Sequence, residues 1–148
     1  MKASGILGTA LLSALLLAGA GCGSVGLEDL EQPVLYWDQR DGLCSQILAV
    51  DRSRTVWMDR GCEEPYDFGE QGGADEAEVE TLRRAFGALP LAVGPDPLEC
   101  DWGLHAFCER DHGSTRCARA CRAGPGYDDT TGLEEPFLAA AQAFLALE

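Results

Sequence analysis

Lysine is almost missing from this chain. Lys2 is the only lysine in 148 residues, and arginine supplies the other ten of the 11 basic side chains. All 25 acidic residues follow position 22 and greatly outnumber these arginines. Nucleic acids and anionic lipid head groups both need a basic surface on their partner, so this charge argues against both. The simplest role of the net negative charge is to keep the protein soluble. The more specific alternative is that the charge attracts a basic partner or binds cations.

Signatures of several enzyme classes are also missing. The sequence contains no Gly-x-Ser-x-Gly and no His-Glu-x-x-His, which mark α/β-hydrolases and zinc peptidases. No Gly-rich loop follows an expected strand in the way that phosphate binding requires. Paired carboxylates such as Asp38 and Asp41 could do acid–base work, but such pairs arise by chance among so many acids. We therefore expect no enzyme, no catalytic residue and no cofactor.

The start of the chain is typical of a bacterial export signal. Ile6 to Leu17 is apolar and uncharged, yet too short for a permanent membrane-spanning helix. Gly19-Ala20-Gly21 then precedes Cys22, the position that a lipoprotein signal reserves for the lipid-modified cysteine. We expect a signal peptide at 1–22 and acylation, including palmitate, at Cys22. Cleavage after Ala20 by ordinary signal peptidase stays open.

These features place the expected protein in the bacterial cell envelope. Neither Gly23 nor Ser24 is the aspartate that holds many lipoproteins at the inner membrane, so the outer membrane is favoured. The acyl chains would make the bilayer its first partner. Residues 23–33 are small and acidic and predict a flexible tether, and residues 34–148 predict one α+β domain.

The seven cysteines support export. An odd number leaves one thiol unexplained, and a lipid on Cys22 would leave six for three disulfides. The expected register of the hairpins favours disulfides between cysteines that lie close together in the hairpins, although sequence alone allows fifteen connectivities. The favoured pairs are Cys44 with Cys62, Cys100 with Cys121, and Cys108 with Cys117. The alternative is a zinc site that uses some of these cysteines with His105 or His112, without the paired C-x-x-C spacing typical of zinc.

Short turns between strand-like segments predict an antiparallel sheet of about four to five strands. The expected strands are Val34 to Asp38, a hairpin of Ser45 to Asp51 with Thr55 to Arg60, and a second hairpin of Trp102 to Glu109 with Ser114 to Ala120. Gly113 supplies a positive φ in the second turn. Gly61 to Ala74 is expected to be a loop.

Two amphipathic helices complete the predicted domain. Asp75 and Glu78 form a capping box at the start of the first, which ends at Pro90. Thr131 and Glu134 repeat the capping pattern before the second. Their apolar faces should cover one side of the sheet, and consist of Val79, Leu82, Phe86 and Leu89 in the first helix and Phe137, Ala141, Phe144 and Leu145 in the second.

The element order resembles that of emfourin, an inhibitor of thermolysin-like metallopeptidases. An aromatic strand with Tyr36 and Trp37 precedes the Gly42 turn, then come Ile47-Leu48-Ala49-Val50-Asp51 and Glu78-x-x-x-Leu82-x-x-x-Phe86. The resemblance covers about residues 34 to 147. It implies an inhibitor of exported proteases, but this chain lacks the family's Ser-Gly-Gly after the first strand, so no inhibitory loop is carried over. Its signal and cysteines are similar to those of uncharacterised bacterial lipoproteins.

Three functions therefore stay open. The first is a non-catalytic binding or structural domain held at the membrane. The second is a protease inhibitor, with Gly94 to Glu99 as its candidate loop, and the third is a small exported enzyme without a visible motif. Trp37, Trp57 and Trp102 should lie under the helices or form an exposed patch that marks a partner site. Asp128 to Gly132 is better explained as a capped turn than as a calcium loop.

Overall fold

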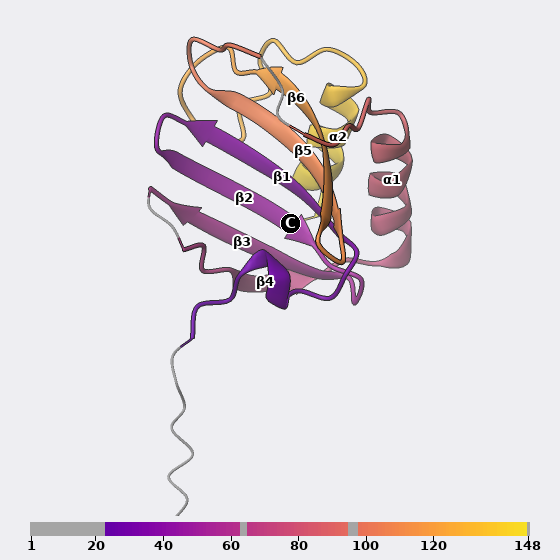
Figure 1. Ribbon diagram of the computed structural model, residues 1–148. Helices are drawn as coiled ribbons and strands as arrows, with labels where there is room; N and C mark the ends of the chain where they lie inside the picture. Colours follow the sequence, from indigo (N-terminus) through magenta and orange to yellow (C-terminus); the bar gives the residue numbers. More distant parts are fainter. Residues whose placement is uncertain (1–22, 63–64, 95–97, 148) are drawn as a thin grey trace, which may run out of the picture.

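A six-stranded antiparallel sheet in the order β4-β3-β2-β1-β5-β6 forms the centre of the computed structural model, which describes residues 23–62, 65–94 and 98–147. Two α-helices lie together behind the sheet in Figure 1. In chain order the elements are the 3-10 helix η1 (Leu27–Asp29), β1 (Val34–Asp41), β2 (Cys44–Val50), β3 (Thr55–Gly61), β4 (Gly69–Gly73), α1 (Glu76–Gly87), β5 (Leu104–Asp111), β6 (Ser114–Cys121) and α2 (Phe137–Leu145).

The sheet has one strand more than the upper end of our expectation. β4 lies inside the segment predicted to be a loop, and its five residues Gly-Glu-Gln-Gly-Gly are all exposed. It pairs with β3 at the edge of the sheet, with a register shift between Val56 and Trp57. No apolar alternation marks such a strand, because an edge strand exposed on both sides buries no side chains.

Both predicted hairpins are present. β2 and β3 pair with Val50 opposite Val56 around the turn at residues 51–54. β5 and β6 turn at His112 and Gly113, whose φ angles of 45° and 87° are both left-handed. Two successive left-handed residues match the right-handed twist of the flanking strands, so Gly113 fills the role predicted for it.

Helix α1 begins as predicted. The Glu78 backbone N–H donates to the Asp75 carboxylate at 2.8 Å, and the Asp75 N–H donates to the Glu78 carboxylate at 2.7 Å. Val79, Leu82 and Phe86 are buried. The helix ends at Gly87, with Ala88 as its C-cap, so it stops shortly before Pro90.

Helix α2 begins later than the predicted cap. It starts at Phe137 after Pro136, with no side-chain cap. The backbone N–H of Thr131 donates instead to the Asp129 carboxylate at 2.9 Å, which places Thr131 in a turn. The physical reason is Pro136, because a proline disfavours helical geometry at the residue before it. The prediction of a cap by Thr131 and Glu134 is therefore wrong.

The helices and the sheet share one core. Trp37 is fully buried at the sheet centre, with its ring centroid 5.6 Å from that of Phe107 and 6.2 Å from that of Phe144. The centroid of Phe86 in α1 lies 5.9 Å from that of Phe144 in α2. The prediction that the apolar helix faces cover one side of the sheet is confirmed for α1, since Val79, Leu82 and Phe86 share a cluster with Leu48, Val50 and Val56, and the partly buried Met58 packs against it.

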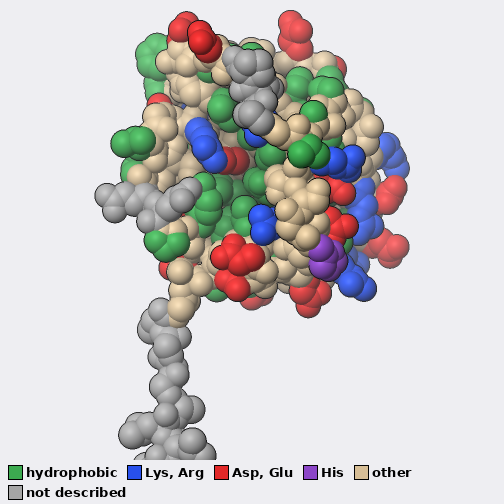
Figure 2. Space-filling view, viewed as in Figure 1, with side chains coloured by type: hydrophobic (Ala, Val, Ile, Leu, Met, Phe, Trp, Pro, Cys, Tyr) green, Lys and Arg blue, Asp and Glu red, His purple; other side chains and the backbone are tan. Residues whose placement is uncertain are grey.

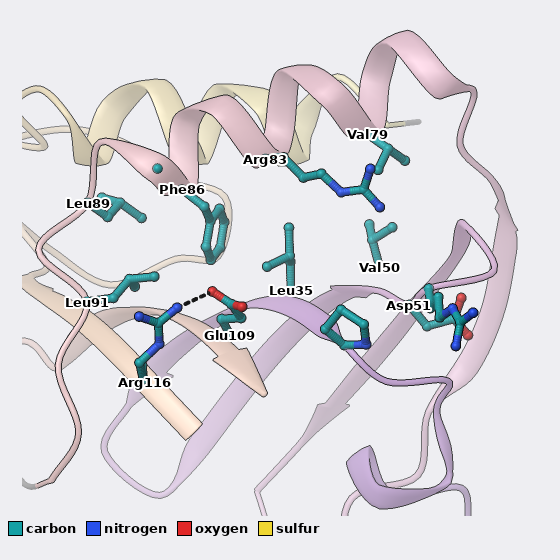
Figure 3. A pocket seen from close by; sticks show the side chains of 13 residues that line it. Leu35, Val50, Asp51, Val79, Arg83, Phe86, Leu89, Leu91, Glu109 and Arg116 are labelled. Carbon is teal, nitrogen blue, oxygen red and sulfur yellow. Dashed lines mark hydrogen bonds and ion pairs between the residues drawn. The ribbon is translucent and has the colours of Figure 1, made fainter. Parts of the chain in front are cut away.

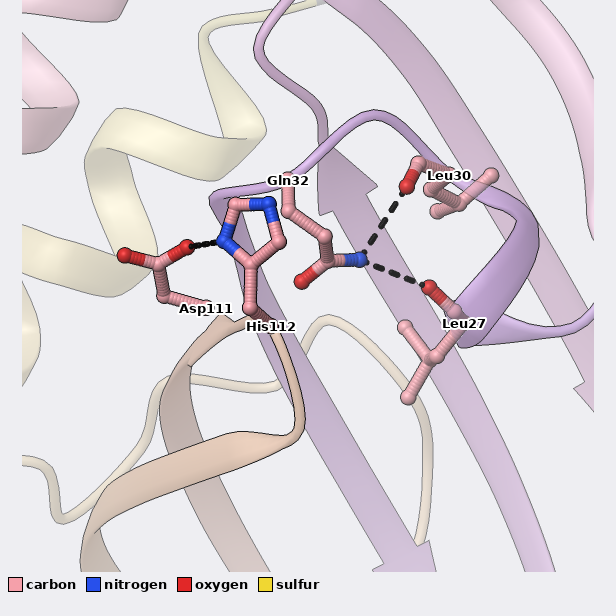
Figure 4. A network of polar contacts seen from close by, with 5 residues as sticks. All are labelled: Leu27, Leu30, Gln32, Asp111 and His112. Carbon is pink, nitrogen blue, oxygen red and sulfur yellow. Dashed lines mark hydrogen bonds and ion pairs between the residues drawn. The ribbon is translucent and has the colours of Figure 1, made fainter.

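The opposite face of the sheet is partly covered by the segment expected to be a tether. Leu30 is buried there with Phe68 and Ile47. The Phe68 N–H donates to the Val25 carbonyl at 2.9 Å, and Gln32 Nε2 donates to the carbonyls of Leu27 and Leu30, both at 3.1 Å (Figure 4). Residues 25–33 therefore belong to the folded domain, and the expectation of a flexible tether over 23–33 is not met.

Three disulfides connect the pairs that hairpin register favoured, namely Cys44–Cys62, Cys100–Cys121 and Cys108–Cys117. Cys108 and Cys117 lie directly opposite each other in β5 and β6. The six cysteines are thus used as disulfides, not as zinc ligands. Cys22 lies outside the described residues. No helix in the described ranges is long and apolar enough to span a bilayer.

Candidate binding pocket beneath helix α1

A pocket of about 380 Å³ lies between α1 and the end of the sheet where β1 begins and β2 ends (Figure 3). This volume is within the range of small-molecule sites, roughly 300–1,000 Å³. Its lining comes from α1, from four strands of the sheet and from the segments around them: Pro33, Leu35, Val50, Asp51, Arg52, Val79, Arg83, Phe86, Gly87, Leu89, Leu91, Glu109 and Arg116.

Apolar side chains from the helix and from the sheet face each other in the inner part of the pocket. Val79 and Phe86 point down from α1, and Leu35 and Val50 point up from the neighbouring strands β1 and β2 (Figure 3). Leu35 and Val50 are direct partners in the antiparallel register. The helical spacing of seven residues and the two-residue alternation of the strands place these side chains on facing surfaces.

Charged groups surround this apolar interior. Arg116 Nη2 donates to Glu109 Oε2 at 2.8 Å, so these two side chains form an ion pair. The Asp51 carboxylate accepts hydrogen bonds from the Ser53 hydroxyl at 2.6 Å and the Thr55 N–H at 3.1 Å. The Trp57 indole N–H also donates to it, at 2.9 Å. Both acids are therefore already neutralised or hydrogen-bonded.

Two guanidinium groups at the pocket have no such partner. The side chains of Arg52 and Arg83 form no ion pair and no hydrogen bond with the part of the chain that the structure describes. Figure 3 shows Arg83 extending from α1 across the pocket toward Val50. Since arginine is always protonated, the three arginines of the lining outnumber its two acids, and the pocket has a small excess of positive charge.

The lining supplies no serine, cysteine, histidine or lysine. Nucleophilic and general acid–base mechanisms use these side chains most often. Among the described residues, no group of three or more His, Cys, Asp or Glu side chains could hold a metal ion. The lining offers apolar contact inside and charged groups at the edge, two of them the carboxylates of Asp51 and Glu109.

A second cluster of buried polar side chains lies at the other end of the core. Gln39 and Gln46 both donate to Asp128 Oδ1, at 3.0 and 2.7 Å. The Asp128 N–H in turn donates to Gln39 Oε1 at 2.7 Å. These bonds attach the loop before α2 to strands β1 and β2, a structural role. The sequence analysis missed this cluster. Its signal in the sequence was a pair of glutamines at strand positions whose side chains face the core.

His105 lies in β5, within the strand that the sequence predicted. The Trp37 indole N–H donates to His105 Nδ1 at 3.1 Å, which leaves the proton on Nε2. Burial and the nearby Arg122 guanidinium lower the pKa of His105 to about 4. His105 is therefore neutral at pH 7, and His112 lies in the exposed hairpin turn as expected.

The sheet face without helices carries a buried carboxylate. Figure 2 shows this face hollowed at its centre, where hydrophobic side chains gather inside a charged rim. Asp38 lies on it and accepts from Arg40 Nε at 2.8 Å. Burial raises the pKa of the Asp38 carboxyl, although Arg40 opposes the shift. Asp41 projects from the other side of β1, because three residues separate the two positions, so they do not form a carboxylate pair.

The three tryptophans lie in different parts of the molecule, and the candidate inhibitory loop is described only at its ends. Trp37 is buried under the helices, Trp57 lies on the other face and Trp102 is 52% exposed. Val93 and Leu98 are exposed at the two ends of the predicted loop, but residues 95–97 lie outside the described residues. The tryptophans therefore do not form the single patch that would mark a partner site.

No protein-family model matches the chain. No curated protein matches it. No solved structure matches it either. The pocket beneath α1 and its charges are therefore the observations that carry the proposed function.

Proposed function

We propose that the protein is a lipoprotein of the bacterial cell envelope, anchored through Cys22 and favoured at the outer membrane. Its folded part is a non-catalytic binding domain. The predicted signal and the three disulfides support export, because structural disulfides persist in oxidising compartments. The anchor on Cys22 would take up the cysteine that the disulfides leave over.

The pocket beneath α1 is the single observation that favours binding over a purely structural role. A domain that only filled space would gain stability by closing this cavity around its apolar residues. The chain instead leaves about 380 Å³ open there, and Arg83 and Arg52 at its edge have no ion pair within the described ranges. Apolar walls with a few convergent polar groups are the usual composition of a ligand site.

The lipid anchor has a direct test. Labelled palmitate should be incorporated into the wild-type protein in its native host and should be absent from Cys22→Ser. The Ser24→Ala variant is the matched control, because it changes a neighbouring residue and leaves the cysteine in place. Equal labelling of wild type and Cys22→Ser would contradict the lipoprotein assignment.

Binding is tested with the unlipidated Cys22→Ser chain. A small-molecule extract of the cell envelope is added, and the NMR signals of Leu35, Val79 and Leu91 are followed. We expect these signals to shift more than those of Leu30 and Ile47 on the opposite face. An extract that moves no pocket signal would leave a structural role and contradict the binding domain.

Inhibition of exported proteases is the second candidate function. Its support is the exposure of Val93 at 74% and Leu98 at 41%, beside the backbone bridge of Ala92 to Cys117 and the Cys100–Cys121 disulfide. A loop held at both ends loses little entropy when it binds a protease. Inhibition of a thermolysin-like metallopeptidase that weakens in Leu98→Asp would favour this function.

A further inference from the structure

We propose that the pocket beneath α1 binds a single-chain aliphatic carboxylate, with the chain against the apolar interior and the carboxylate at Arg83. This inference rests on the proposed function, since it names the ligand class of the same pocket. The expected ligands are fatty acids of medium length, free or released from membrane lipid.

The apolar part of the ligand follows from the pocket walls. Six of the thirteen lining residues are large and apolar, and they come from the sheet, from α1 and from the segment after it: Leu35, Val50, Val79, Phe86, Leu89 and Leu91. A volume of about 380 Å³ equals about a dozen water molecules at ~30 Å³ each. A saturated chain of about eight to ten carbons fits this space, and removing its CH₂ groups from water favours binding.

The charge of the ligand follows from Arg83. Arginine in the last turn of a helix can simply complement the helix dipole, and the neighbouring Arg84 can serve that purpose. Arg83 instead lies over the pocket in Figure 3, pointing toward Val50 at the end of β2. A guanidinium offers two parallel N–H donors, the geometry that a carboxylate accepts.

The arginines of the pocket outnumber its acids, since Arg52, Arg83 and Arg116 line it with Asp51 and Glu109. Glu109 is paired with Arg116 at 2.8 Å, and Asp51 is held by three hydrogen bonds within its own turn and strand. Arg52 lies beside Asp51 in the lining and adds a second guanidinium without an ion pair among the described residues. An anion is therefore attracted at this point of a chain whose net charge is −14.

The experiment compares octyl compounds that differ in the head group alone. The chain from Gly23 onward is used, because it carries neither acyl chains nor the apolar segment Ile6 to Leu17 and therefore needs no detergent. Octanoate should bind saturably by calorimetry and shift the NMR signals of Leu35, Val79 and Leu91. Octanol should bind at least about tenfold more weakly, as expected when a charged hydrogen bond is lost, and octylammonium should not bind.

Three variants separate the carboxylate contact from the pocket itself. Arg83→Gln should weaken octanoate binding about tenfold and leave octanol binding unchanged. Arg84→Gln is the matched control, on the same helix but outside the lining, and should bind octanoate as wild type. Gly87→Leu should weaken binding of every octyl compound, because Gly87 lines the pocket and a Cβ there meets nothing within 4 Å, which leaves room for a larger side chain at the ligand.

The outcomes distinguish this inference from the proposed function. Octanol binding as tight as octanoate, or Arg83→Gln without effect on octanoate, would overturn the carboxylate assignment and leave a ligand pocket. Tighter binding of octyl phosphate than of octanoate would overturn it in favour of a phosphate ester. If octyl compounds move no pocket signal while the envelope extract does, this inference fails alone. If neither moves a pocket signal, both fail.

Discussion

Polar side chains inside the core show how single residues set the behaviour of this domain. His105 is fully buried and accepts the indole N–H of Trp37. A protonated ring could not accept that bond, and its charge would lie beside Arg122. The lowering of the pKa of His105 to about 4 follows from burial first and from Arg122 second. The neutral ring is thus a condition for the packing around Trp37.

This pKa predicts that acid destabilises the fold through His105. The unfolded chain takes up the proton near the ordinary pKa of about 6.5, and the folded chain does so only near 4. Stability should therefore fall as pH drops from about 6.5 toward 4 and should be fully present above that window. Urea unfolding at several pH values measures this loss.

Two histidine variants test whether the loss of stability in acid comes from the imidazole ring of His105. His105→Gln keeps a side-chain oxygen that can accept from Trp37 and should flatten the pH dependence between 6.5 and 4. His112→Gln changes the exposed histidine of the hairpin turn and should behave as wild type. An identical acid loss in wild type and His105→Gln would show that carboxylates alone produce it.

At the level of elements, the features predicted from sequence were those with local signals. The capping box of Asp75 with Glu78 and the positive φ of Gly113 each act within a few residues, so the sequence shows them directly. β4 has no such signal, because Gly-Glu-Gln-Gly-Gly forms a strand only by pairing with β3. The segment around Leu30 looked like a tether because one apolar residue in an acidic stretch does not reveal what it packs against.

The pocket also has no sequence signal of its own. Arg83 and Leu35 are far apart in the chain, and each fits an ordinary amphipathic pattern. Their relation depends on how far α1 stands from the ends of β1 and β2. Such a separation is a tertiary property and is not encoded in the period of either element.

Helix α1 should contribute strongly to stability through Phe86. This ring is 3% exposed and meets Phe107 edge-on at a centroid distance of 6.4 Å. Phe86→Ala should lower the free energy of unfolding by roughly 3–5 kcal/mol, because the cavity that it leaves between Phe107 and Phe144 cannot fully collapse. Urea unfolding monitored by tryptophan fluorescence measures the change.

The exposed side of the same helix supplies the control. Glu80 is exposed on α1, and Glu80→Ala should change stability by less than about 0.5 kcal/mol. A loss below about 1 kcal/mol for Phe86→Ala would mean that α1 is not a necessary part of the core.

For the whole molecule, the packed segment at residues 25–33 changes how the domain would stand at the membrane. The backbone of Val25 is already fixed, since its N–H donates to Asp67 at 3.2 Å and its carbonyl accepts from Phe68 at 2.9 Å. Three residues from Cys22 can extend at most about 11 Å, at ~3.6 Å each. An acylated Cys22 would therefore hold the domain close to the bilayer, whereas a free ten-residue tether would let it move away.

This geometry predicts close approach of the domain to the bilayer, and it predicts that only a variant with a longer tether responds to salt. Energy transfer from the tryptophans to dansyl-labelled lipid should be efficient for the acylated protein on zwitterionic vesicles. Inserting a ten-residue Gly-Ser linker after Gly23 should reduce it, because the domain then samples larger distances. On anionic vesicles the net charge of −14 should repel the domain from the surface and lower the energy transfer of the linker variant at about 0.01 M salt, where the Debye length is about 30 Å. At about 0.15 M salt the Debye length is about 8 Å, and this decrease should disappear. Equal transfer with and without the linker would show that residues 25–33 do not hold the domain at the surface.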